Sequence, residues 1–127
     1  MDMKERAELA AEYKTKMNCA QAVLMAYAEE LGKSEEELLA LGSGFGAGMG
    51  GMEATCGALC GAGIAMGLLN KSGRPASMLM REALKDFKTR SGATVCADLK
   101  GIQTGKPLCP CDDCVRNAVY AMEGLRG

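Results

Sequence analysis

The chain has 127 residues with 15 basic and 16 acidic side chains, and its net charge of −1 gives no general attraction to nucleic acid or to an anionic membrane. This length predicts a single domain over residues 1–127, large enough to bury its own core. Aromatic residues make up only 4% and Trp is absent, while Met and Gly are plentiful, which favours an all-α fold over a β-sandwich.

The first part of the chain is predicted to form three helices, from its apolar periodicity and its capping residues. The first covers residues 2–16. The second covers residues 19–31, with Asn18 as its N-cap and Gly32 as its C-terminal stop. The third follows Ser34, which opens a capping box, and three of its side chains are expected to provide burial: Leu38, Leu39 and Leu41.

A glycine-rich loop over residues 42–51 is expected to precede the central helix, which is predicted over residues 53–70 and carries Cys56 and Cys60. Part of this loop matches the pattern G-x-G-x-x-G. A leucine-rich helix precedes it where a nucleotide-binding motif would have a strand, so we expect a packed loop instead.

The remaining helices are expected over residues 76–90 and 112–125, with a short helical piece over 94–99 that carries Cys96. The whole chain is therefore predicted to be a compact single-domain helical bundle of about six helices. The helix over 76–90 is expected to have an inner face formed by Met78, Leu79, Ala83, Leu84 and Phe87.

Seven cysteines and no histidine define the chemistry that is open to this chain. The N-terminus is not a secretory signal and the longest weakly polar run, residues 57–69, is too short to span a bilayer, so we expect a cytoplasmic protein without membrane contact. In a reducing compartment many cysteines indicate redox chemistry or metal binding. The absence of histidine removes Ser-His and Cys-His catalysis and the Cys/His zinc fingers.

The C-terminal cysteines form one cluster. Cys111 and Cys114 have C-x-x-C spacing at the start of a helix, where the helix dipole favours a thiolate. Together with Cys109 and Cys96 they also make a plausible four-thiolate site for zinc or an iron–sulfur cluster.

The central cysteines form a second cluster. Cys56 and Cys60 are four residues apart, so on a helix they would share one face. Gly57 and Gly61 form a small-xxx-small pair beside them, which lets a neighbouring backbone come close. The same pattern also suits a tightly packed core helix in which the cysteines are small apolar side chains.

Four segments together resemble a known family: Asn18-Cys-Ala-Gln-Ala-Val23, the glycine run leading to Thr55-Cys-Gly-Ala-Leu-Cys-Gly61, the lone Cys96, and Cys111-x-x-Cys114. They are similar to the small redox-active proteins named after a C…CGAxxG…C…C pattern, the C_GCAxxG_C_C family. The resemblance covers about residues 15–122, and it implies a mainly helical protein with four family cysteines.

The resemblance assigns the four family positions to Cys19, Cys56, Cys96 and either Cys111 or Cys114. These thiols lie at predicted helix starts, so we expect them to converge on one site where the helix dipoles favour thiolates. The resemblance makes Cys60 an additional cysteine and leaves Cys109 without an assignment.

Three hypotheses for function follow. The first is a thiol-based redox protein, similar to a thiol–disulfide oxidoreductase, in which Cys19 and Cys56 form a reversible disulfide or a relay with the other family cysteines and a redox partner. The second is an electron-transfer or metal protein whose family thiolates hold an iron–sulfur cluster or zinc. The third is a helical interaction module whose glycine face docks a partner or forms a homo-oligomer.

Overall fold

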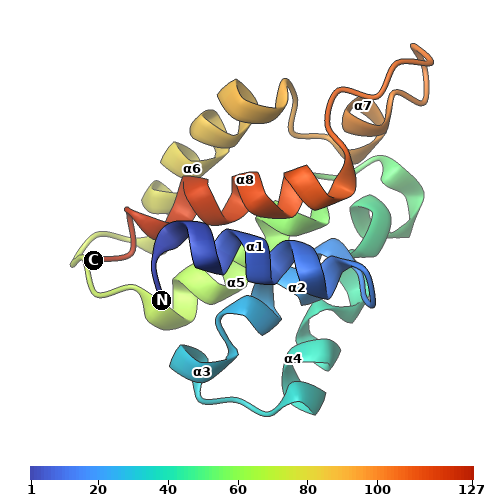
Figure 1. Cartoon of the computed structure of the whole chain (residues 1–127). Coiled ribbons are helices and arrows are strands. Elements are labelled where there is room, and N and C mark those ends of the chain that lie inside the picture. The colour runs from blue at the N-terminus through green and yellow to red at the C-terminus, as the bar shows by residue number, and fades with distance from the viewer.

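The computed structural model describes residues 1–127 and contains eight α-helices and no strand (Figure 1). The all-α prediction is confirmed, whereas the prediction of about six helices is wrong because one predicted helix is divided and short helices lie between the long ones. The helices are α1 Met3–Lys14, α2 Cys19–Ala26, α3 Ala28–Leu31, α4 Glu35–Gly42, α5 Gly57–Leu69, α6 Ala76–Ser91, α7 Cys96–Lys100 and α8 Cys111–Glu123.

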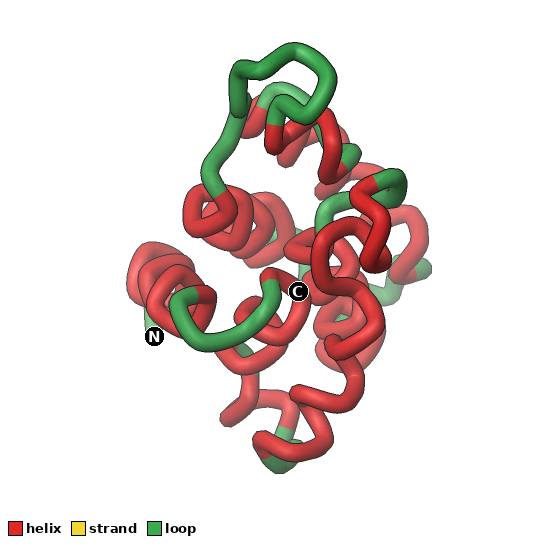
Figure 2. Tube along the Cα trace, turned by 90° about the vertical axis from the view of Figure 1, so that its right-hand side faces the viewer, coloured by secondary structure: helices red, strands yellow, loops and turns green.

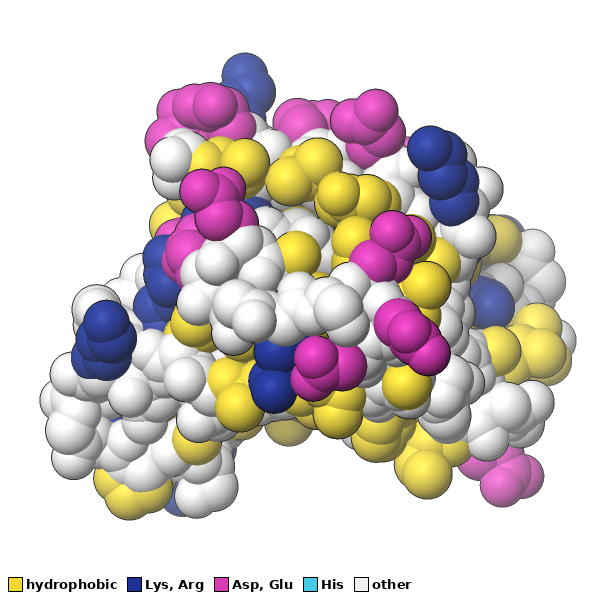
Figure 3. All heavy atoms as spheres, turned by 90° about the horizontal axis from the view of Figure 1, so that it is seen from below, with side chains coloured by type: hydrophobic (Ala, Val, Ile, Leu, Met, Phe, Trp, Pro, Cys, Tyr) yellow, Lys and Arg dark blue, Asp and Glu magenta, His cyan; other side chains and the backbone are white.

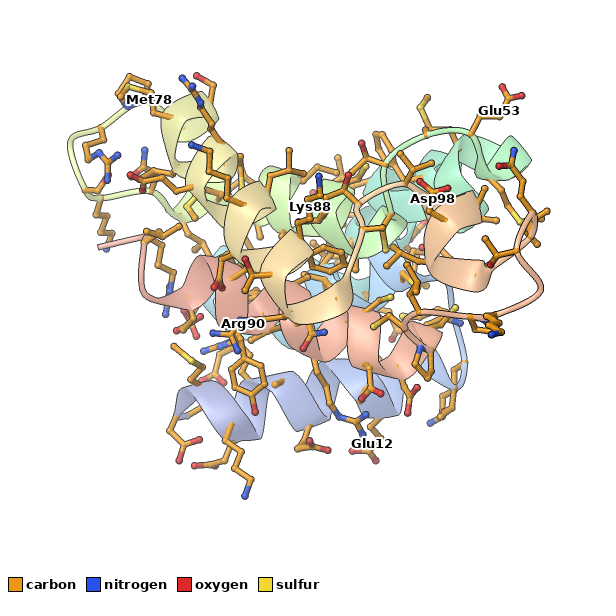
Figure 4. The ribbon with its side chains drawn as sticks, turned by 90° about the horizontal axis from the view of Figure 1, so that it is seen from above. Glu12, Glu53, Met78, Lys88, Arg90 and Asp98 are labelled. Carbon is orange, nitrogen blue, oxygen red and sulfur yellow. The ribbon has the colours of Figure 1, made fainter.

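Helix α5 is the centre of the packing, because it contacts α2, α6 and α8 and its residues are apolar around much of its circumference. Helix α8 lies between α1 and α6, as Figure 4 shows from above. Helix occupies most of the trace, and the loop over residues 101–110 projects at one end (Figure 2). The largest fully buried side chains include Leu24, Tyr27, Leu38, Met66, Leu79, Phe87, Leu99 and Met122.

The helix predicted over residues 19–31 is divided at Tyr27, whose backbone angles of φ −106° and ψ 11° fall outside the helical range. The division leaves the Ala26 carbonyl free of a helical partner, and the Arg6 side chain donates to that carbonyl at 2.7 Å. The buried Tyr27 hydroxyl donates to Glu123 at 2.5 Å. The break is therefore compensated by tertiary contacts that a local pattern cannot predict.

A group of charged side chains around the buried Arg6 joins α1, α3 and the C-terminal end of α8. Arg6 is only 4% exposed and pairs with Glu30, and its guanidinium lies over the Tyr27 ring at 4.3 Å. Arg126 pairs with Glu30 at 2.6 Å and with Glu123 at 3.0 Å. Opposite charges thus compensate one another where the helices meet.

The predicted buried faces of α4 and α6 are wider than the real ones. Leu38 of α4 is fully buried but Leu41 is exposed, and on α6 both Met78 and Leu84 are exposed. Figure 4 shows Met78 pointing away from the core. The side chains of α6 that are buried lie four residues apart on one narrow stripe, because this helix packs only on α5 and α8: Leu79, Ala83 and Phe87.

Helix α5 begins at Gly57, four residues later than predicted, because the preceding residues run alongside residues 94–96 instead of joining the helix. Thr55 and Val95 form an isolated antiparallel β-bridge. The Cys56 amide donates to the Thr94 carbonyl at 2.8 Å, and the Cys96 amide donates to the Ala54 carbonyl at 3.0 Å. Cys56 is therefore the N-cap residue of α5 and not part of its body.

The glycine-rich segment is not a plain loop. It contains a short 3-10 turn, Ser43–Phe45, and an irregular wide turn, Gly48–Met52. Three residues that are not glycine have positive φ angles in or beside this turn, namely Ala47, Met49 and Met52. Such conformations are costly for residues with a side chain, so surrounding contacts must hold this turn in place.

None of the helices combines the length and the apolar character that crossing a membrane requires. On the face seen from below, acidic side chains are scattered among apolar ones and basic side chains occur singly (Figure 3). This face therefore has no continuous basic patch of the kind that binds a phosphate backbone.

Candidate functional site

Six of the seven cysteines line one small cavity of about 20 Å³: Cys19, Cys56, Cys96, Cys109, Cys111 and Cys114. This volume accommodates about one water molecule. Lys100 is the only charged residue in the lining. All the predicted site cysteines are therefore brought together, although none of them forms a disulfide.

The cavity lies where four helices begin. Cys19, Cys96 and Cys111 are the first residues of α2, α7 and α8, and Cys56 is the N-cap residue of α5. These four starts meet at the right-hand side of Figure 1. The thiols converge at helix starts as expected. The expectation that the helix dipoles favour thiolates there is wrong for Cys19, Cys96 and Cys114, because burial and neighbouring thiols raise their pKa values.

The Asn-Cys-Ala-Gln segment positions Cys19 through a complete capping box. Asn18 accepts a hydrogen bond from the Gln21 amide at 2.8 Å, and Gln21 accepts one from the Asn18 amide at 3.1 Å. The same two side chains donate to carbonyls of α4, Asn18 to Gly42 at 3.2 Å and Gln21 to Leu39 at 2.8 Å. The motif thus holds the start of α2 against α4.

The CGAxxG glycines provide clearance between α5 and its neighbours. A Cβ atom on Gly61 would lie 2.5 Å from the Ala20 carbonyl oxygen, and one on Gly57 would lie 2.7 Å from the Phe45 carbonyl oxygen. Gly57 and Gly61 therefore face their own chain, so the hypothesis that they dock a partner is wrong for these two positions. Gly48 plays a similar part beside the cavity, where an added Cβ would lie 2.7 Å from the Cβ of Cys96.

Cys56 is the thiol that the site holds as a thiolate. Interaction with the neighbouring thiols of Cys114 and Cys19, to which the amides of Ala58 and Leu59 at the start of α5 add, lowers the pKa of Cys56 to about 3. Burial opposes the shift, since Cys56 is only 4% exposed. The hydrogen bonds prevail because several donors point at one sulfur.

The neighbouring thiols are held in the protonated form. Hydrogen bonding to Cys56, followed by burial, raises the pKa of both Cys19 and Cys114. Burial also raises the pKa of Cys96, although the nearby Lys100 acts in the opposite direction. One thiolate among protonated neighbours is the arrangement that thiol–disulfide exchange requires.

Cys60 does not belong to the cavity. Its thiol donates to the Thr55 carbonyl at 3.9 Å, and burial raises its pKa. The prediction that Cys56 and Cys60 share a helix face is wrong, because Cys56 lies before the helix begins. The neighbouring Glu53 is exposed and points into solvent, away from the thiols (Figure 4).

Lys100 lines the cavity although the sequence did not single it out. Cys109 was grouped with the other C-terminal cysteines as a possible metal site but was not given a family position. Cys109 is buried, and its sulfur accepts a hydrogen bond from Asn117 at 3.8 Å. Cys19 and Cys111 are half-buried, so they are the lining thiols that solvent reaches most readily.

No group of three or more Cys, Asp or Glu side chains is arranged to hold a metal ion. A zinc ion or an iron–sulfur cluster requires several thiolates at fixed distances from a common centre. Metal ligation by Cys19, Cys56, Cys96 and Cys111 or Cys114 therefore stays a prediction.

The chain combines an all-α fold with one cavity lined by six cysteines. Residues 17–125 match the family model described as "Putative redox-active protein (C_GCAxxG_C_C)", and the chain belongs to this family. Neither the search of curated proteins nor the search of solved structures found a match to this chain. The family and the cysteine cluster together support a general redox role.

Proposed function

We propose that this protein is a thiol–disulfide redox protein that works through a reversible disulfide between Cys19 and Cys56. The observation that supports the proposal is the Cys56 thiolate, which is buried beside the half-exposed thiol of Cys19 in a cavity lined by cysteines. The two thiols have complementary properties. Cys19 is accessible to solvent and protonated, whereas Cys56 is ionised and buried.

The reaction begins at Cys19, because Cys56 is too buried to meet a substrate larger than a few atoms. The Cys19 sulfur attacks one sulfur of a small disulfide while its proton passes to the departing substrate sulfur. The substrate S–S bond breaks, one substrate thiol leaves, a mixed disulfide forms on Cys19, and Cys56 stays a thiolate.

Cys56 then resolves the mixed disulfide. Its thiolate attacks the Cys19 sulfur, the mixed disulfide bond breaks, and the second substrate sulfur leaves as a thiolate that takes up a proton from solvent. The substrate disulfide has gained two electrons and the protein has lost two, so the products are two reduced substrate thiols and a Cys19–Cys56 disulfide. An external dithiol returns the protein to its starting state by the reverse reaction.

A small aromatic disulfide whose released thiol absorbs light tests this function. Reduced wild-type protein is expected to release two thiols from each disulfide, and Cys56→Ser is expected to lose at least about 99% of the rate of release of the second thiol because it removes the thiolate that resolves the intermediate. Cys60→Ser is the matched control, since this thiol lies outside the cavity, and it should keep the wild-type rate. An unchanged rate in Cys56→Ser would contradict the proposal.

A further inference from the structure

Cys109 and Asn117 adjoin the thiol cavity but have no part in the reaction proposed above. Asn117 donates to the Cys109 sulfur at 3.8 Å and to the Ser91 hydroxyl at 2.9 Å. The Cys114 thiol donates to the Cys109 carbonyl at 3.6 Å, which places these two cysteines against each other. Cys109 is thus a buried thiol that has both a donor on its sulfur and a second thiol beside it.

The thiols of four cysteines line the same cavity of about 20 Å³: Cys19, Cys56, Cys109 and Cys114. Cys19 and Cys114 are the neighbours that lower the pKa of Cys56, and the Cys114 sulfur lies 3.6 Å from the Cys109 carbonyl oxygen. The order across the cavity is therefore Cys19, Cys56, Cys114 and Cys109. Three different helix starts contribute to this series, because Cys109 lies just before α8 and Cys114 lies in its first turns.

We propose that Cys109 is the terminal resolving thiol of this site, and that a disulfide formed at Cys19–Cys56 moves through Cys114 to become a buried Cys109–Cys114 disulfide. The inference rests on the proposed function, since that reaction supplies the first disulfide. It gives Cys109 a role in the reaction, although Cys109 is not one of the four family cysteines.

The transfer takes two exchanges and needs no further oxidant. In the first, the Cys114 sulfur loses its proton and attacks Cys56, the Cys19–Cys56 bond breaks, and Cys19 leaves and takes up a proton. In the second, the Cys109 sulfur loses its proton to solvent and attacks Cys114, the Cys56–Cys114 bond breaks, and Cys56 leaves as a thiolate. The number of disulfides stays at one throughout.

The direction of transfer follows from the second exchange and from the donor on Cys109. The first exchange depends on the position of Cys114 beside Cys56, whereas in the second the leaving thiol is Cys56, whose pKa is lowered, and a thiol of low pKa leaves fastest. Asn117 is a positioning residue here, because its amide stabilises charge on the attacking Cys109 sulfur without contacting the bond that breaks. The transfer frees Cys19 and Cys56 for a second substrate.

Peptide mapping of the full chain after oxidation by one equivalent of a small aromatic disulfide tests the proposal. After equilibration, wild-type protein is expected to carry the Cys109–Cys114 link in at least about tenfold excess over Cys19–Cys56, which corresponds to about 30 mV for a two-electron couple. In Cys109→Ser the final exchange is not possible, so the disulfide of this variant is expected to include Cys56. Cys109→Ala provides the same test if serine disturbs this buried position.

The outcomes separate the transfer from the function on which it rests. A wild-type protein that keeps Cys19–Cys56 and never links Cys109 would overturn the transfer and leave the proposed function intact. A Cys56→Ser protein that forms Cys109–Cys114 as fast as wild type would overturn both, because the disulfide would then arise without Cys56.

Variants of Asn117 test its positioning role. Asn117→Leu removes the donor and is expected to slow the appearance of the Cys109–Cys114 link by on the order of tenfold, while the initial consumption of the disulfide stays unchanged. Ser91→Ala is the matched control, because it removes the other hydrogen bond of the same amide. Equal transfer rates in Asn117→Leu and wild type would overturn the role of Asn117.

Discussion

At the scale of single residues, the distribution of protons among the thiols sets the chemistry. Cys56 has the lowered pKa because donors surround its sulfur, whereas Cys19 and Cys114 have raised pKa values because they are those donors. A sequence pattern identifies the cysteines but not which of them is ionised. That depends on the position of the Cys56 sulfur between Cys19 and Cys114.

The pH dependence of alkylation tests this division. With a pKa of about 3 the Cys56 thiolate is already formed at pH 5, so its alkylation rate by a small reagent should be nearly constant from pH 5 to pH 8. An ordinary thiol, with a pKa near 8.5, would gain about tenfold per pH unit over this range. Peptide-resolved alkylation rates measure the difference.

Replacing Cys114 should restore the pH dependence of an ordinary thiol to the alkylation of Cys56. Cys114→Ala is expected to raise the pKa of Cys56, so its alkylation rate should increase with pH, whereas Cys60→Ala should leave the rate constant. A wild-type rate that rises tenfold per unit would show that Cys56 is protonated at neutral pH.

At the scale of helices, the close approach of α2 and α5 places Cys19 beside Cys56. The approach depends on Gly61, because a Cβ atom there would lie 2.5 Å from the backbone of Ala20. Gly67 lies further along the same helix and has no atom of another element within 4 Å of an added Cβ. Substitution by alanine is therefore expected to change the free energy of unfolding in opposite directions at Gly61 and Gly67.

Gly61→Ala is expected to lower the free energy of unfolding by about 1–3 kcal/mol, because the added methyl group would push the helices apart. Gly67→Ala should raise it by about 0.5–1 kcal/mol, since alanine is the better helix former and the space is open. Chemical denaturation of both variants measures the two changes. A stabilised Gly61→Ala protein would contradict the clearance role.

Local signals predicted the helix ends, while tertiary contacts decided the exceptions. Asn18, Ser34, Gly32 and Gly92 cap helices as expected, because capping depends only on neighbouring residues. The late start of α5 could not be predicted, since it depends on pairing with residues about 40 positions further along the chain. The break at Tyr27 likewise depends on a partner in α8.

The candidate site could likewise be predicted only in part from the sequence. The cysteines of the motif were recognisable as a set, because their spacing resembles a family pattern and each precedes a helix. Cys109 was grouped with the C-terminal cysteines but not with Cys19 and Cys56, because only the fold brings these thiols to one cavity. Cys60 lost its expected place because the helix begins after Cys56.

At the scale of the whole molecule, the charged cluster and the thiol cavity lie at opposite ends of α8. The cluster joins both terminal segments through Arg6, Glu30, Glu123 and Arg126, whereas the cavity lies at the start of the helix (Figure 1). Stability and redox chemistry are therefore expected to respond to different substitutions.

Arg6→Ala is expected to lower the free energy of unfolding by about 1.5–3 kcal/mol, because it removes the charged hydrogen bonds of a buried guanidinium to Glu30 and to the Ala26 carbonyl. Arg90→Ala removes the exposed pair with Asp86 and the contact with the Tyr120 ring, and should cost less than about 1 kcal/mol. Thermal denaturation compares the two variants. Equal losses would show that the Arg6 cluster adds no more than a surface pair.

The central claim is that Cys56 takes part in the first disulfide that forms. Its most direct test is oxidation of reduced wild-type protein with one equivalent of a small disulfide, followed by acid quenching at increasing times and peptide mapping of every cysteine. The account predicts that Cys19–Cys56 is the earliest link within the protein. A protein that becomes oxidised while Cys56 stays free for alkylation at every time point would contradict it.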